Sequence, residues 1–307
     1  MTYSILGRDS TTGQLGVAVQ SRYFGAGRVV PFIDAGVGVI ASQAFANPAY
    51  GHEGLRLLRE GLDPQTILER LVAQDAASSR RQVAVMNALG HTAVHTGRDC
   101  VAAAGHAIGT DCCAQGNMLS QPTVWRAMVQ AFEATTGDLV DRLLAAMDAA
   151  EREGGDLRGR QAAALVVATG TPSGLARRDV EIDVRIDDHP DPVRELRRLA
   201  DAARAHVRAN RAMERILAND AAAALVDLDA CCAAHPEEAT FLFRRALALL
   251  ALDRRGEARD MLSRAQAIHP GWGELLLRFA DAKVIPARRD DLQALLRSCD
   301  QPMGDER

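Results

Sequence analysis

Five short motifs carry the polar side chains that could do chemistry, and all five lie in the first 200 residues. They contain hydroxyl, amide and guanidinium groups. Each is expected at a strand end or in a loop, where a rigid scaffold presents functional groups. Glycine-rich junctions also form ordinary turns, so no motif is specific by itself. The motifs are Gly-Val-Ala-Val-Gln-Ser-Arg (16–22), Ala-Ser-Gln-Ala-Phe-Ala-Asn-Pro-Ala-Tyr-Gly (41–51), His-Thr-Gly (95–97), Ala-Gln-Gly-Asn (114–117) and Gly-Gly-Asp-Leu-Arg-Gly-Arg-Gln (154–161).

Four residues of these motifs could line a pocket for a small-molecule or peptide substrate. Arg160 is suited to a carboxylate, because a guanidinium matches the geometry of that group. Each of the four could equally hold a turn or, as with Arg160 and Asp156, pair with a surface acid. The predicted substrate-binding residues are Asn47, Tyr50, Arg160 and Gln161.

The histidines and cysteines form no metal or disulfide pattern. His91 and His95 would share one face of a strand, but two ligands without a third make a weak metal site. The six cysteines include two adjacent pairs and no Cys-x-x-Cys spacing, so reduced thiols are expected. We therefore expect neither a metal nor another cofactor.

Hydrophobic periodicity predicts alternating blocks of strands and helices in the first part of the chain. Blocks of like elements indicate an α+β layered domain rather than a doubly wound fold. The expected strands are 2–7, 15–21, 29–33, 37–43, 82–87, 92–96, 101–108, 161–169 and 179–186, and the expected helices are 50–60, 65–73, 122–134 and 139–152.

The last third of the chain is predicted to be entirely helical. Ala224, Leu228, Cys231 and Pro236 superimpose on Ala258, Leu262, Ala265 and Pro270 at a shift of 34 residues. That period resembles the tetratricopeptide repeat, which would bind a peptide or pack a subunit. An ordinary alanine-rich helical hairpin domain is the alternative. We predict two domains, residues 1–203 and 204–307.

Composition excludes several classes of partner. The formal net charge of the 307 residues is −4, which lacks the basic footprint of a nucleic-acid binder. No apolar run is long enough to span a bilayer, and the polar start does not resemble a signal peptide. We expect a cytoplasmic protein without membrane or nucleic-acid partners. Lys283 is the only lysine, so the first domain has none for catalysis.

The first 200 residues resemble an uncharacterised bacterial family of predicted N-terminal-nucleophile (Ntn) hydrolases. The resemblance rests on four features: the opening Met-Thr-x-Ser, the Asn-Pro-x-Tyr-Gly turn, the Gln-Gly-Asn triplet, and the closing Asp-Asp-His-Pro-Asp-Pro. It implies a four-layer αββα sandwich. It also implies that Thr2, after removal of Met1, is a nucleophile whose α-amino group takes the hydroxyl proton. Ser4 would face the same side of the strand, near the amine or the attacking oxygen, or else a polar gap.

The segment Val-Gln-Ser-Arg at 19–22 looks like the Val-Asp-Ser-Arg of proteasome-type Ntn subunits. Arg22 would then orient the backbone near the nucleophile. Gln20 stands in place of the acid, and the usual lysine beside the threonine is missing. These departures leave open a different substrate class, a different partner such as Arg28, or a scaffold that has lost hydrolysis.

Acyl transfer also needs preorganised donors for the oxyanion of its intermediate. We predict Ser42 and Gln43, at a strand end, and the amide of Asn117 for this role, although such residues also satisfy loop backbone. The predicted function is hydrolysis of an amide-like C–N bond. The rival prediction is a non-catalytic Ntn-like scaffold that binds a protein through its helical repeats. A homodimer is expected from the general commonness of that symmetry.

Overall fold

The structure, a computed structural model, describes residues 2–285 and 287–299. The chain divides into a first compact unit that ends at Asp201 and a second that begins at Ala202. The division falls inside one helix, α6 (Pro192–Leu217). The first unit contains two antiparallel sheets with helices, and the described part of the second is helical, so the predicted α+β class is confirmed.

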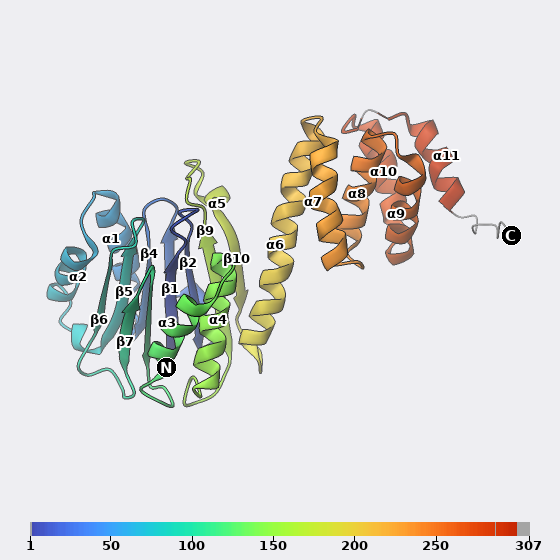
Figure 1. Ribbon diagram of the computed structural model, residues 1–307. Coiled ribbons are helices and arrows are strands. Elements are labelled where there is room, and N and C mark those ends of the chain that lie inside the picture. Colours follow the sequence, from blue (N-terminus) through green and yellow to red (C-terminus); the bar gives the residue numbers. More distant parts are fainter. Residues whose placement is uncertain (1, 286, 300–307) are drawn as a thin grey trace. The chain divides into compact units, whose positions relative to one another are not determined.

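The larger sheet of the first unit has the strand order β10-β9-β2-β1-β8-β7 (Figure 1). Its central hairpin pairs β1 with β2 in a register that joins Tyr3 to Gln20 and Arg8 to Leu15. On the other side of β1, Thr2 pairs with Asn117 of β8. The strands are β1 (Thr2–Arg8), β2 (Leu15–Ser21), β7 (Gly105–Gly109), β8 (Cys112–Asn117), β9 (Ala162–Ala168) and β10 (Val180–Ile186).

The smaller sheet has the order β3-β4-β5-β6. Its strands are β3 (Pro31–Asp34), β4 (Gly38–Ala44), β5 (Arg81–Asn87) and β6 (Thr92–Thr96). Short helical turns η1 (Ala26–Arg28) and η2 (Ser78–Arg80) precede β3 and β5, and the short helix α5 (Ala176–Asp179) precedes β10.

The two sheets pack face to face, and helices cover both outer faces (Figure 1). Apolar side chains such as Leu6, Val17, Val39 and Met86 fill the space between the sheets. Helices α1 (Pro48–Arg59) and α2 (Pro64–Ala73) cover the smaller sheet, and α3 (Val124–Ala134) and α4 (Leu139–Arg152) cover the larger one.

Two glycines let α3 and α4 approach the larger sheet closely. A Cβ atom at Gly16 would lie 2.6 Å from Leu143, and one at Gly7 would lie 2.7 Å from Phe132. Both contacts are shorter than van der Waals distance. Leu143 and Phe132 are completely buried as a result, and they anchor the helical layer on the central hairpin.

The described part of the second unit contains the end of α6 and five further helices. Helices α7 (Ala221–Ala234) and α9 (Arg255–Ile268) have equal lengths and are offset by 34 residues, as the sequence period predicts. The others are α8 (Ala239–Ala251), α10 (Gly271–Asp281) and α11 (Arg289–Cys299). Alanines at helix crossings, such as Ala224 and Ala258, are fully buried. Within the described ranges, no helix combines the length and the hydropathy that crossing a bilayer requires.

One strand differs from the prediction. The sequence predicted a single strand over 101–108, whereas the structure has β7 at Gly105–Gly109 and a separate strand, β8, at Cys112–Asn117. The segment Cys-Cys-Ala-Gln-Gly-Asn lacks the β-branched and aromatic residues that mark strands. Because every residue of β8 is buried, its position is determined by pairing with β1 and β7 rather than by propensity.

We predict that Leu143→Ala lowers the free energy of unfolding of the first unit by about 2–5 kcal/mol, because it opens a cavity under α4. Denaturant unfolding of the full-length protein measures this. Leu89→Ala, at a position 71 % exposed, should change stability by less than about 0.5 kcal/mol. Equal effects of the two substitutions would contradict the packing described.

Candidate functional site

Thr2 is the first residue of β1, which lies between β2 and β8 in the larger sheet. Its Oγ1 atom is 3.0 Å from Oγ of Ser21, the last residue of β2, and either hydroxyl can donate. The residue is only 7 % exposed. Because Thr2 alternates with Tyr3, it faces the smaller sheet, whereas Tyr3 faces α4 and donates a hydrogen bond to Glu151. The predicted nucleophile is therefore held by strand pairing with Asn117 on one side and by its hydroxyl contact with Ser21 on the other.

Four amide side chains lie between the sheets just below Thr2, and we call them the amide cluster. Gln43 Nε2 donates to the carbonyl oxygen of Thr2 at 3.2 Å and to Gln82 Oε1 at 2.9 Å. Ser4 Oγ donates to Gln43 Oε1 at 2.7 Å. All of these side chains are at most 1 % exposed. The cluster consists of Gln43, Gln82, Gln115 and Asn117.

The other members of the amide cluster connect the strands further. Asn117 Nδ2 donates to Gln82 Oε1 at 3.0 Å, and Gln115 Nε2 donates to the Ala41 carbonyl at 3.0 Å. Gln82 Nε2 donates to the Gly116 carbonyl at 2.8 Å. In the described chain, Gln115 Oε1 and Asn117 Oδ1 are buried without a hydrogen-bond partner. The polar layer thus joins both sheets at one end of the apolar core.

A cavity of about 370 Å³ opens beside Thr2. Its wall is mostly apolar, and none of its lining residues is an aspartate or glutamate. Ala44, in the wall, has a φ of 67°, a left-handed conformation that turns the chain sharply between Gln43 and Phe45. The polar or aromatic lining residues are Thr2, Ser21, Tyr23, Gln43, Phe45, Arg81 and Arg158.

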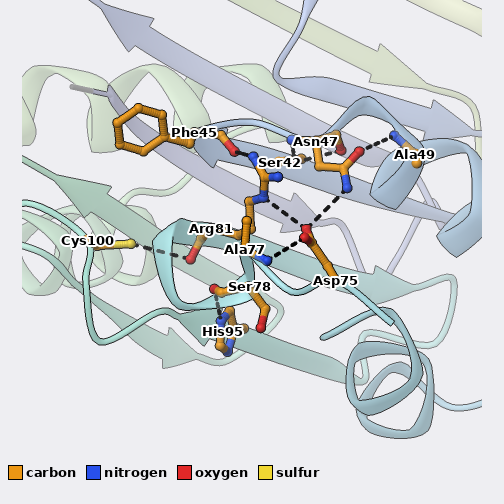
Figure 2. A network of polar contacts seen from close by, with 10 residues as sticks. All are labelled: Ser42, Phe45, Asn47, Ala49, Asp75, Ala77, Ser78, Arg81, His95 and Cys100. Atoms are coloured by element: carbon orange, nitrogen blue, oxygen red, sulfur yellow. Dashed lines mark hydrogen bonds and ion pairs between the residues drawn. The ribbon is translucent and has the colours of Figure 1, made fainter. Parts of the chain in front are cut away.

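Arg81, the first residue of β5, lines the cavity. Its guanidinium lies between Asp75 and the carbonyl of Phe45 (Figure 2). Its Nε donates to Asp75 Oδ2 at 2.9 Å, and its Nη1 donates to the carbonyl of Phe45. Asp75 also accepts from the Ala77 amide at 2.8 Å and from Asn47 Nδ2 at 3.3 Å. Partial burial alone would raise the pKa of Asp75, but these donors outweigh it and lower its pKa to about 2. Asp75 is therefore an ionised anchor for the guanidinium.

Arg158 reaches the same cavity from the loop between α4 and β9. Asp156, whose side chain is fully buried, organises this loop. It accepts from the amide of Arg22 at 2.8 Å and from the amide of Arg158 at 2.9 Å, and it lies 3.3 Å from Nη2 of Arg158. The second cavity arginine is thus also paired with an acid that does not line the cavity.

The predicted catalytic residues divide into two groups. Thr2, Ser4, Gln43 and Asn117 come together around the amide cluster. Ser42 lies apart from it, because its amide donates to the Val30 carbonyl and its hydroxyl to the Asn47 carbonyl, so neither points at Thr2. The side chain of Arg22 is exposed and donates to the Arg160 carbonyl at 2.7 Å, away from the cavity lining.

The predicted substrate-binding residues do not line the cavity. Asn47 caps α1 and binds Asp75. Tyr50 is buried beside Asp75. Burial is the largest cause that raises the pKa of its phenol, and the Asp75 carboxylate is the second. Arg160 pairs with Glu151 and Asp191, and Gln161 donates to Asp188 at 3.1 Å. The ion pairs and hydrogen bonds of these side chains account for their positions.

The structure brings in residues that sequence reasoning missed. Ser21, and not Gln20, faces Thr2, because the β1–β2 register pairs Gln20 with Tyr3 on the α4 side. This register could have been read from the alternation of the two strands. Both polar atoms of Gln20 are buried without a partner among the described residues. Nothing in the sequence distinguished Arg81, Arg158 or Gln82 from their neighbours, because their roles depend on loops and on the smaller sheet.

The histidines and cysteines do not form a further site. Across residues 2–285 and 287–299, no group of three or more histidine, cysteine or acidic side chains is placed to hold a metal ion. Thr96 Oγ1 lies 2.9 Å from Nδ1 of His106 and links that ring to Gln82. Burial raises the pKa of the Cys112 thiol to about 12, so this cysteine stays protonated and unreactive.

Residues 2–196 match the family model described as a family of unknown function, DUF1028, and the chain belongs to this family. The prediction of an uncharacterised family is thereby confirmed. The crystal structure of protein SPO2555 from Silicibacter pomeroyi, assigned to the same family model, is 34 % identical with a TM-score of 0.60; the match covers 66 % of this chain and 85 % of that chain. Anbu (ancestral beta-subunit) from Yersinia bercovieri is 13 % identical with a TM-score of 0.32, over 64 % of this chain and 92 % of that chain. No curated protein matches.

We predict that Asp75→Asn destabilises the first unit by up to about 2 kcal/mol at neutral pH, since the pKa of Asp75 is lowered on folding. A carboxyl with a lowered pKa stabilises the fold above about pH 4 and loses this effect as the pH falls toward 2. The difference between wild type and variant, measured by denaturant unfolding, should therefore shrink from pH 5 to pH 2. Thr11→Ala, which removes an exposed hydroxyl and no titratable group, should show no such trend.

Proposed function

We propose that the first unit is an amidohydrolase of the N-terminal-nucleophile type, with Thr2 as the nucleophile. The observation that carries this proposal is the Thr2 hydroxyl at the wall of the 370 Å³ cavity, with its backbone paired to Asn117 and its hydroxyl against Ser21. A nucleophile at the start of a strand leaves its own α-amino group close to the hydroxyl. The layering of helix, two sheets and helix supports the assignment to the Ntn sandwich.

The proposed reaction needs no group beyond this residue, the substrate and water. Thr2 Oγ1 attacks the amide carbonyl while the α-amino group, with an ordinary pKa near 8, accepts the hydroxyl proton. The C–N bond then breaks as this proton passes to the leaving amine, which leaves an ester on Thr2. Water, activated by the same amine, hydrolyses the ester. The mechanism requires removal of Met1, which lies outside the described residues.

Ser21 and Gln43 are the neighbours that would support Thr2. The Ser21 hydroxyl, 3.0 Å from Thr2 Oγ1, can orient the attacking oxygen or pass a proton between it and the amine. Gln43 donates to the Thr2 carbonyl and lines the cavity, and Ser4 fixes its orientation through Oε1. Ser4 is therefore proposed as a positioning residue.

Variants of Thr2 test this function in the full-length protein. With a panel of amide, lactam and ureido compounds, Thr2→Ala should lose at least about 10³-fold in turnover, whereas Thr2→Ser should keep part of it. Mass spectrometry should detect an acyl group on the N-terminal peptide. Thr11→Ala, at an exposed hydroxyl in the β1–β2 turn, is the control.

Two results would remove the Thr2 mechanism. One is a mature protein that retains Met1, seen by intact-mass measurement, and the other is unchanged turnover by Thr2→Ala. Either would favour the alternative, a non-catalytic scaffold with a helical-repeat binding module. The 34-residue offset of α7 and α9 and an apolar groove of about 320 Å³ in the second unit support that alternative. Cytoplasmic location and a homodimer remain predictions.

A further inference from the structure

The cavity beside Thr2 combines an apolar wall with two guanidinium groups, and this combination restricts its ligand. Of its thirteen lining residues, Arg81 and Arg158 are the only charged ones. The acids that pair with them, Asp75 and Asp156, do not line the cavity. A ligand therefore meets guanidinium, hydroxyl, amide and apolar side chains, but no carboxylate.

Building on the proposed function, we propose that the substrate is an amide that carries both an apolar acyl chain and a carboxylate, and that Arg81 binds the carboxylate. An N-acylated amino acid has this chemistry. Its acyl chain would pack on the apolar wall, and its carboxylate would reach the guanidinium. The amide between them would then lie in the space beside Thr2.

The hydrogen bonds of Arg81 make it a preorganised anion-binding residue. Nε and Nη1 are occupied by Asp75 and by the Phe45 carbonyl, and Nη2 has no hydrogen-bond partner among the described residues. The Arg81 side chain is 19 % exposed, so it is fixed in position but still accessible to a ligand. A charge-assisted hydrogen bond to a guanidinium already held in place costs little ordering entropy. Figure 2 shows this arrangement, with Asp75 on one side of Arg81 and Phe45 on the other.

The apolar part of the wall accounts for the acyl chain. Val29 and Val30 precede β3, Phe45 directly follows β4, and Pro48 is the first residue of α1. Phe45 is 55 % exposed and Tyr23 is 58 % exposed, although both side chains are large and mostly apolar. Large exposed apolar side chains around a cavity are expected where a ligand covers them.

A pair of ligands of nearly equal size tests the proposal without any catalytic step. N-hexanoylglycine and N-hexanoylglycinamide differ only in a carboxylate against a neutral amide. Their binding is measured by titration calorimetry on full-length Thr2→Ala protein, so the result does not depend on whether Thr2 reacts. We expect the carboxylate to bind at least about tenfold more tightly.

Arg81→Gln, introduced into the same background, should reduce that preference to about twofold or less. Arg8→Gln is a matched control, because Arg8 also bridges an aspartate, Asp111, and a carbonyl, that of Ala88, and is 17 % exposed. It lies at the opposite end of β1 from Thr2. The control should keep the full preference for the carboxylate, and thermal unfolding of both variants checks that they are folded.

Three outcomes would overturn the proposal: equal binding of the two ligands, no measurable binding of either, or a preference that survives Arg81→Gln in folded protein. Arg81→Lys should recover part of the preference, which a merely structural role for Arg81 would not produce. Failure here leaves the Thr2 mechanism intact, because that mechanism is judged by turnover and acylation. Conversely, an unreactive Thr2 would not change the binding result.

Discussion

The hydrogen bonds of the amide cluster are the interactions on which the position of Thr2 depends. Gln43 belongs to the smaller sheet, yet its amide donates to the backbone of Thr2 in the larger one. A buried amide that loses its partner costs about 1–3 kcal/mol, so the sheets cannot slide at this end without breaking several such bonds. The cluster thus replaces the apolar packing found deeper between the sheets and fixes the relative register of β1, β4, β5 and β8.

This polar layer has a structural consequence, because it separates Thr2 from the apolar core. A threonine on a purely apolar face would be driven inward by burial, whereas here Ser4 and the amide cluster fill the space below it. Thr2 consequently stays at the cavity wall, with its hydroxyl against Ser21. Two buried acceptors in the cluster, Gln115 Oε1 and Asn117 Oδ1, remain without partners among the described residues, and each is a suitable place for a bound water.

The sequence predicted where strands and helices lie along the chain better than it predicted which of them pair or pack together. Hydrophobic periodicity located both strands of the β1–β2 hairpin and the helix at 65–73, which in the structure is α2, capped by Asp63. The sequence of β8 shows almost no β-propensity, so its pairing with β1 was not predicted. Thr2 and Asn117 were predicted to act in the same catalytic site, but not to lie opposite each other on paired strands. The loop 154–161 contains Arg158 and Arg160, and only the buried Asp156 decides that Arg158 enters the cavity while Arg160 pairs with Glu151.

The missing acid of the Val-Gln-Ser-Arg segment can be understood from this geometry. Gln20 lies opposite Tyr3 and faces α4, so an aspartate at this position would not point at Thr2 in this register. In the proposed mechanism, activation of the threonine would instead come from the other face, where Ser21 contacts it. Asp75 and Asp156 pair with the two cavity arginines but do not line the cavity themselves. The cavity therefore presents hydrogen-bond donors and no acid that would repel an anionic substrate. In the proposed mechanism the two arginine–aspartate pairs therefore serve recognition, and proton transfer is left to the hydroxyls and the amine at the end of β1.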